Sequence, residues 1–149
     1  MKKIFTYALV ALATVAMLAC SKPADNEKEE EKKEEAPAYP TDYATWTEAS
    51  TWGVTGSIAS AKLNWDGDIA MKANSESTWH VATGVVLTAS DEFKFRKDAD
   101  WAVNFGGTCA AAGKAFDVAQ NGANIKVPAD GTYTLLLDTE NAKAVVIAE

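Results

Sequence analysis

The feature of this sequence that most constrains its fold is the alternation of apolar and polar residues from Thr45 to the end of the chain. Successive side chains of a β-strand point to opposite faces of a sheet, so this alternation predicts strands with one buried face. Gly, Asn, Asp and Pro interrupt the segments at the spacing typical of a sandwich or barrel, and no helical period is present. The predicted buried sets are Trp52, Val54 and Ile58; Trp79 and Val81; Phe93 and Phe95; Tyr133, Leu135 and Leu137; and Val145 and Ile147.

These segments predict one all-β domain over residues 45–149, an antiparallel, immunoglobulin-like β-sandwich. The sequence Asp-Thr-Glu-Asn at 138–141 predicts a short hairpin loop between the last two strands. Trp52 and Trp79 lie on the apolar side of their segments, which predicts that both pack in the core. Trp46 precedes the first segment and is expected to cover one end of the sandwich.

The N-terminus has the pattern of an export signal over residues 1–19. Lys2 and Lys3 precede an apolar stretch at 4–19, and small residues lead to Cys20. Met-Leu-Ala-Cys at 17–20 resembles the bacterial lipobox, which predicts cleavage before Cys20 and lipidation of its thiol. A retained membrane helix fits less well, because the stretch is short for a bilayer and no basic flank follows it.

Residues 20–44 are predicted to form the lipidated cysteine and a disordered tether. The sequence SKPADNEKEEEKKEEAP at 21–37 contains Glu, Lys and Asp but no aromatic or β-branched residue. Such a segment buries too little apolar surface to offset the entropy of ordering it. An acidic run soon after a lipidated cysteine resembles the tag that directs some lipoproteins to the cell exterior. A plain spacer on the periplasmic side remains the alternative.

Charge and cysteine content exclude several classes of function. The net charge of −7 leaves no basic stripe to neutralise phosphates, so no nucleic-acid partner is expected. Once Cys20 is lipidated, Cys109 is the remaining thiol and no intrachain disulfide is available. His80 has no Cys or His at metal-ligand spacing, so neither a metal site nor a cofactor is predicted.

The candidate binding residues are two tryptophans and two cations. Trp65 lies in the polar, turn-forming sequence Asn-Trp-Asp-Gly-Asp, where a buried indole is not expected. Trp101 follows a charged segment, and it either provides a second ring or braces the loop after it. Lys94 and Arg96 alternate with Phe93 and Phe95, so they point away from the core, as ligand donors or as an ordinary solvated face. Aromatic rings and charged donors suit a pyranose, which has an apolar C–H face and a rim of hydroxyls.

An enzyme would need acid–base residues in addition. Asp66 with Asp68, or Asp91 with Glu92, could form the carboxylate pair of a glycosidase. Asp-Gly-Asp at 66–68 is more simply a turn, or at most half of a calcium loop. No nucleophile–base set is evident, because His80 has no evident partner. The sequence therefore predicts a protein that does not catalyse a reaction.

Several short segments occur in a fixed order along the domain. They are Gly-Ser at 56–57, Trp-Asp-Gly-Asp-Ile-Ala-Met at 65–71, Glu-Phe-Lys-Phe-Arg at 92–96, Trp101, Asn-Phe-Gly-Gly at 104–107, Asn-Gly-Ala-Asn-Ile-Lys-Val-Pro-Ala at 121–129, Gly-Thr-Tyr-Thr at 131–134 and Leu-Asp at 137–138. This ordered set resembles the SusE/SusF-type starch-binding outer-membrane lipoproteins.

The resemblance implies a β-sandwich module on the exterior of the outer membrane that holds α-glucan for a neighbouring glycan-uptake complex, with Trp65 and Lys94 at positions like those that this family uses. Family members usually carry several modules in series, whereas this chain has one. The alternative is a structural or protein-interaction lipoprotein with the same fold.

Overall fold

The structure is a computed structural model and describes residues 38–149. The predicted export signal, the lipobox and the acidic run lie outside the described residues. The described part contains one 3₁₀ turn, η1 (Tyr43–Thr45), followed by strands only. The strands are β1 (Glu48–Ile58), β2 (Leu63–Asn64), β3 (Ile69–Ala73), β4 (Trp79–Leu87), β5 (Glu92–Lys97), β6 (Asn104–Gly107), β7 (Phe116–Gln120), β8 (Gly131–Asp138) and β9 (Lys143–Ala148).

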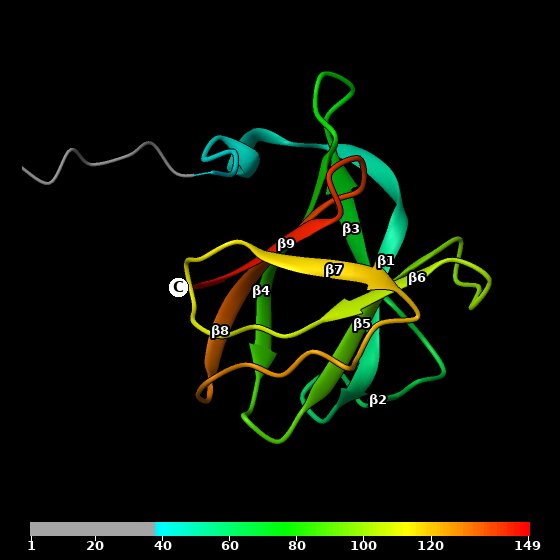
Figure 1. The fold of residues 1–149 in the computed structure, drawn as a ribbon, viewed down its shortest axis with the longest axis vertical. Coiled ribbons are helices and arrows are strands. Elements are labelled where there is room, and N and C mark those ends of the chain that lie inside the picture. The colour runs from blue at the N-terminus through cyan, green and yellow to red at the C-terminus, as the bar shows by residue number, and fades with distance from the viewer. Residues whose placement is uncertain (1–37) are drawn as a thin grey trace, which may run out of the picture. The chain divides into compact units, whose positions relative to one another are not determined.

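All strand pairs are antiparallel, which confirms the all-β antiparallel prediction (Figure 1). The strands do not separate into two sheets as an immunoglobulin-like sandwich would. Their order is β2-β1-β3-β4-β8-β9-β7-β6-β5, and β5 also pairs with β1 over the register Trp52↔Lys97 to Ser57↔Glu92. The pairing between β1 and β5 joins the two edges of the sheet, so eight strands form a closed barrel with β2 attached to the end of β1.

The barrel interior is filled by the alternating apolar residues of the strands. Trp52, Val54 and Ile58 of β1 and Phe93 and Phe95 of β5 are all buried there, as the alternation predicts. The interior sets of the other strands are Met71 of β3; Ala82, Val85 and Leu87 of β4; Val118 of β7; Tyr133, Leu135 and Leu137 of β8; and Ala144 and Val146 of β9.

A second apolar cluster lies on the outer face of β4, β8 and β9. The segment at residues 39–46, here called the strap, packs over this face, and we call the covered face the strap wall. Trp46 is only 3% exposed there. The buried members of the cluster are Trp46, Val81, Leu136 and Val145, and the partly buried ones are Tyr39, Tyr43, Trp79 and Ile147.

The position of the strap shows that three sequence-based predictions are wrong. Trp79, Val81, Val145 and Ile147 are not in the barrel interior, because they point outward from their strands and pack under the strap. Trp46 covers a side of the barrel and not an end. Tyr39 and Tyr43 belong to the same cluster, so the packed part of the chain begins before residue 45.

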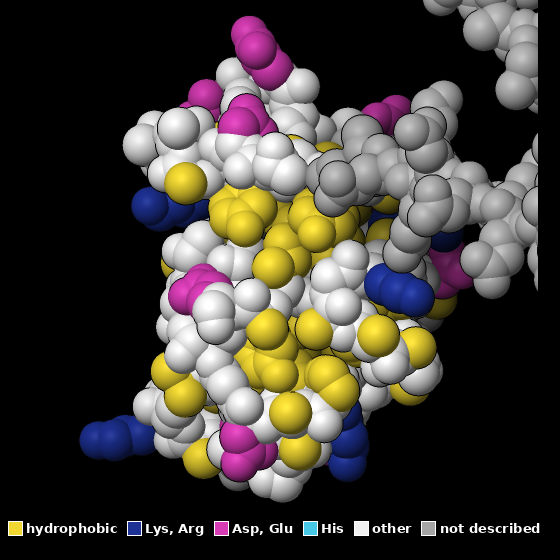
Figure 2. All heavy atoms as spheres, turned by 90° about the vertical axis from the view of Figure 1, so that its left-hand side faces the viewer, with side chains coloured by type: hydrophobic (Ala, Val, Ile, Leu, Met, Phe, Trp, Pro, Cys, Tyr) yellow, Lys and Arg dark blue, Asp and Glu magenta, His cyan; other side chains and the backbone are white. Residues whose placement is uncertain are grey.

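The strap wall is the side of the molecule that carries β8 and the C-terminal end of the chain in Figure 1. Figure 2 views this side and shows hydrophobic side chains gathered on its surface. At one end, the loop 139–142 joins β8 to β9, as the sequence predicts for a hairpin. None of the helical segments within residues 38–149 has the length and apolar character needed to cross a membrane.

Candidate functional site

The candidate site lies on the outer face of β1, β5 and β6, which we call the aromatic wall. The loops that follow β2 and β5 reach it on the right-hand side of Figure 1, opposite β8. Trp65 comes from the first loop and Trp101 from the second. Their ring centroids are 5.9 Å apart and their planes are inclined by 44°. The structure therefore brings together the two tryptophans that the sequence singled out, and we call them the aromatic pair.

Trp65 is held in an unusual backbone conformation. Its φ is 66°, in the left-handed region that bulky residues rarely adopt. Its backbone N–H donates to the carbonyl of Gly56 in β1 over 2.9 Å, which fixes the loop against the barrel. Strained backbone of this kind is often found at functional sites, because surrounding contacts must maintain it. The strain here positions a half-exposed indole.

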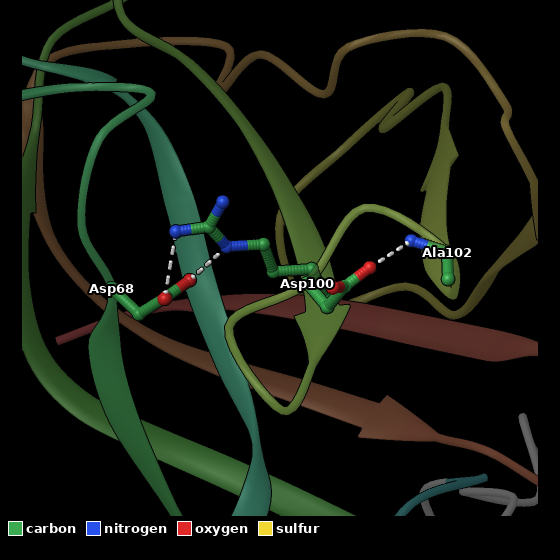
Figure 3. Close-up of polar contacts among 4 residues, drawn as sticks. Asp68, Asp100 and Ala102 are labelled. Carbon is green, nitrogen blue, oxygen red and sulfur yellow. Dashed lines mark hydrogen bonds and ion pairs between the residues drawn. The ribbon is translucent and has the colours of Figure 1, made fainter.

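Trp101 is the more exposed ring of the pair, at 43%. Its loop is braced by Asp100, whose Oδ1 accepts a hydrogen bond from the backbone N–H of Ala102 over 2.7 Å (Figure 3). Asp98 and Ala99, in the same loop, both have a positive φ of 54°. Trp101 is thus presented on a structured turn and is not part of the core.

Arg96 links the two loops. Its Nε and Nη2 donate to the two carboxylate oxygens of Asp68 over 2.8 and 2.9 Å (Figure 3). Its guanidinium carbon lies 4.9 Å from the ring centroid of Trp101, which is cation–π distance. Because Asp68 is in the loop of Trp65, Arg96 connects the supports of both rings. The hydrogen bonds that Arg96 donates to Asp68 raise the pKa of Arg96, so the guanidinium is charged at any ordinary pH.

This arrangement differs from the role expected for Arg96. The sequence places it on the outward side of β5 as a donor to ligand hydroxyls, and the structure does place it outward. However, Arg96 is buried, and two of its nitrogens are already bonded to Asp68. The outward face of β5 is not solvated here, because the Trp65 loop folds over it. In the structure Arg96 supports the aromatic pair.

Lys94 is half-buried and lies on the same face of β5 as Arg96. Its Nζ donates to Oδ1 of Asn104 over 3.0 Å. An ammonium group has three donors, so two remain for other acceptors. Of the two predicted cations, Lys94 is the one placed to donate to a ligand at this wall.

Asn104 is a supporting residue that sequence reasoning missed. It is buried in β6, and its Nδ2 donates to the carbonyl of Trp101 over 2.9 Å and to Oδ1 of Asn121 over 2.8 Å. With Lys94 on its Oδ1, this one amide fixes three neighbours. The segment at 104–107 was expected to be a loop and is a strand, and its Asn between two apolar residues was the available signal, because a buried amide needs several partners.

Two glycines allow the loop of Asn121 to approach β6. A Cβ on Gly106 would lie 2.7 Å from the carbonyl oxygen of Gly122 and would also collide with that of Ala123. A Cβ on Gly122 would collide in turn with the carbonyl of Gly106. The loop therefore packs directly on the strand and brings Asn121 to Asn104.

The carboxylates considered for catalysis all have structural partners. Asp68 pairs with Arg96, and Asp66 accepts from the backbone N–H of Asn64 over 3.1 Å, as in a turn. Asp91 is buried and accepts from the backbone N–H groups of Thr88 and Ala59. Glu92 pairs with Lys126 over 2.9 Å, and hydrogen bonds from Lys126 and Asn124 lower its pKa.

The two remaining reactive side chains are His80 of β4 and Cys109, which packs against the barrel interior. His80 contacts Ser50 Oγ through Nδ1 at 2.8 Å, and burial lowers its pKa. Burial also raises the pKa of Cys109, which keeps the thiol protonated. Among residues 38–149, no group of three or more His, Cys, Asp or Glu side chains is placed to hold a metal ion.

Comparison with known proteins does not assign a family. No protein-family model matches the chain, and no curated protein shows significant similarity to it. The interpretation of the aromatic wall therefore rests on its residues and their geometry.

Proposed function

We propose that this chain is a lipid-anchored lipoprotein of the outer membrane, facing the cell exterior, that binds α-glucan without catalysis. The aromatic pair stacks on the apolar faces of the sugar rings. Lys94 donates to their hydroxyls, and Arg96 holds the two tryptophan loops in register. The partners are an α-glucan or a related glycan and, through the same glycan, a neighbouring uptake complex.

The observation that carries this proposal is the convergence of Trp65 and Trp101. They come from loops after β2 and β5, and both rings remain partly exposed. Two rings inclined by 44° form an angled surface, which suits a curved α-linked chain better than a flat one. Large aromatic rings with polar neighbours at their rim are the usual elements of a sugar platform.

The polar residues around the pair support binding over hydrolysis. A glycosidase needs two carboxyl groups free to act on one bond, about 5–10 Å apart. At this wall Asp68 is occupied by Arg96, and Asp66 caps its own turn. Asp100 accepts from the backbone N–H of Ala102 in the turn of Trp101, and the amides and cations beside the pair bind hydroxyls but do not provide an acid–base pair.

The assignment to the SusE/SusF-type family, with its immunoglobulin-like class, is part of this proposal. It rests on the resemblance of the segments, whereas the strands pair as a closed barrel. A structural or protein-interaction lipoprotein is the competing function. It would use the same fold without needing the aromatic pair to contact a ligand.

Glycan retention in native gels tests the binding site. Residues 20–149 with Cys20→Ser should migrate more slowly in gels that contain amylopectin. A single shallow platform should bind with a Kd of about 0.1–1 mM, because stacking and a few exposed hydrogen bonds must offset the entropy of association. Trp65→Ala and Trp101→Ala should each remove most of the retardation. Trp79→Phe, on the opposite wall, is the matched control and should migrate like the parent protein.

Two outcomes of this assay would contradict the proposal. Steady release of reducing ends from amylopectin would indicate a hydrolase. An absence of retardation with any of a panel of glucans, together with recovery of a stable protein partner, would indicate the scaffold function.

The anchor and its location are tested in cells. Cys20→Ala should leave the precursor uncleaved by the lipoprotein peptidase and remove the protein from the detergent phase. Protease added to intact cells should degrade the domain if it faces the exterior. A Cys20→Ala protein that still partitions with lipid would refute the anchor, and protection until the outer membrane is opened would place the domain in the periplasm.

A further inference from the structure

A hollow lies on the strap wall, on the side of the barrel opposite the aromatic pair. It has a volume of about 370 Å³, within the usual range of small-ligand pockets, roughly 300–1,000 Å³. It forms where the strap meets the outward side chains of β3, β4 and β8. Its lining residues are Tyr43, Ala44, Lys72, Val81, Thr83, Thr134 and Glu149.

Part of the hollow is apolar. Tyr43 and Val81 both belong to the cluster under the strap, and Val81 is only 1% exposed. The aromatic ring comes from the strap, whereas Val81 comes from the barrel. The hollow therefore exists only because the strap is docked, and the apolar surface that it offers to a ligand is that of the half-exposed Tyr43.

The rest of the hollow is polar, with an acceptor already held in place. Glu149 Oε1 accepts from Thr134 Oγ1 over 2.7 Å and from the backbone N–H of Gly84 over 2.9 Å. These two hydrogen bonds lower the pKa of Glu149, so the carboxylate is ionised and its second oxygen can accept further donors. Across residues 38–149, Lys72 forms no ion pair or side-chain hydrogen bond, so its ammonium group can donate to a ligand.

From this combination we infer that the hollow is a second carbohydrate subsite, which takes one or two sugar residues of the glycan class bound by the aromatic pair. The inference rests on the proposed function. A pyranose ring matches the lining, because its C–H face can pack on Tyr43, and its hydroxyls can both donate to Glu149 and accept from Lys72. One positive and one negative group nearly cancel, which favours a neutral polyol over an anion or a cation.

Two subsites on opposite walls make the single domain bivalent. One chain segment would bind the aromatic pair and another would bind the strap wall. Weak sites on one rigid domain then hold a branched polysaccharide more tightly than either site alone, through effective concentration. Each site can also be removed by mutation without changing the other, because the two sites share no residue.

Amide chemical shifts measured by NMR during titration with maltoheptaose test the inference. The protein is residues 20–149 with Cys20→Ser. Two groups of amides should shift: those around Trp65 and Trp101, and those around Tyr43, Thr83, Gly84 and Glu149. Trp65→Ala should abolish the first group of shifts and leave the second.

A variant pair isolates the hollow. Lys72→Met combined with Glu149→Gln should weaken binding at the second group at least about fivefold and leave the first unchanged. Lys72 is exposed, so Lys72→Met alone keeps the fold and should give a smaller loss in the same direction. Lys114→Met, at another exposed lysine, is the control and should change neither group.

The outcomes separate this inference from the proposed function. Shifts at the aromatic pair alone would overturn the second subsite and leave the proposed function standing. Shifts at neither wall would refute both. Shifts at the hollow with glycylglycine but not with maltoheptaose would overturn the carbohydrate class, because the charge pair would then be binding a zwitterion.

Discussion

The two opposite walls of this barrel use tryptophan in different ways. On the strap wall, Trp46 is 3% exposed and packs with aliphatic residues of β4, β8 and β9. On the aromatic wall, Trp101 is 43% exposed and is held by a braced turn and by Arg96. The residue type is the same, but the segment that covers the wall differs. The first indole belongs to the strap and packs against the barrel, whereas the second has one face available for a ligand.

The walls also differ in what maintains them. Leu135, Leu136 and Leu137 of β8 are all fully buried, because the strap seals the outward face while the barrel interior seals the other. That wall is stabilised by apolar burial, about 25 cal/mol for each Å² removed from water. The aromatic wall depends on directed polar contacts of Arg96, Asp68 and Asn104. Damage to the apolar cluster of the first wall should therefore affect folding, whereas damage to the polar contacts of the second should affect binding as well as stability.

The largest expected effect comes from removing the strap's indole. Trp46→Ala should lower the free energy of unfolding by about 3–5 kcal/mol, because it empties a buried aromatic site. Urea denaturation followed by circular dichroism measures the loss. Trp101→Ala is the matched variant on the other wall and should cost less than about 1 kcal/mol, since its ring is exposed.

Trp46→Phe sharpens this prediction. Trp46 Nε1 is buried and has no hydrogen-bond partner within the described residues. Replacing the indole by phenyl keeps most of the apolar area and removes an unsatisfied donor, which costs about 1–3 kcal/mol when buried. Trp46→Phe should therefore be much milder than Trp46→Ala. If Trp46→Ala loses as little free energy of unfolding as Trp101→Ala and Trp46→Phe, the strap is not an integral part of the fold.

The next effect concerns the ion pair that connects the aromatic loops. Asp68→Asn removes one charge and one acceptor from the two hydrogen bonds of a buried guanidinium. It should lower the free energy of unfolding by about 1.5–3 kcal/mol, the usual worth of a hydrogen bond to a charged group. It should also weaken amylopectin binding about tenfold, because the two rings lose their common support.

Asp66→Asn is the control for this change in the same loop. Asp66 is exposed, and an asparagine oxygen can still accept from the backbone N–H of Asn64. Stability and affinity should both stay near those of the parent protein. If Asp68→Asn lowers stability but leaves affinity intact, Arg96 is a structural residue only and does not position the pair.

The sequence predicts which segments form strands better than it predicts what each strand packs against or pairs with. Alternation locates β1 and β5 and the buried sides of both, because each has one apolar face. It misassigns Trp79 and Val145, since β4 and β9 are apolar on both sides where the strap covers them. The pairing of β1 with β5 that closes the barrel leaves no local signal, because the two strands lie far apart in the sequence and no hairpin turn joins them.

The candidate site shows the same limit. Trp65 and Trp101 stand out in the sequence, because large indoles are unexpected in polar turns. Their meeting depends on barrel closure, which places the loops after β2 and β5 together. The partners of Arg96 and Asn104 are long-range contacts, so one strand's pattern could not distinguish a ligand donor from a support.

The smallest expected effect comes from His80, which should make stability, but not glycan binding, depend on pH. Burial lowers its pKa below the ordinary value of 6.5, so the folded state binds its proton less readily than the unfolded chain. The stability that this provides is fully present above pH 6.5 and is lost as pH falls toward the lowered pKa. Between pH 7.5 and pH 5.5, the free energy of unfolding should fall less in His80→Gln than in the parent protein. Glycan retention should be equal at both pH values, because indole rings do not titrate. An unchanged pH dependence of stability in His80→Gln would show that other groups cause it.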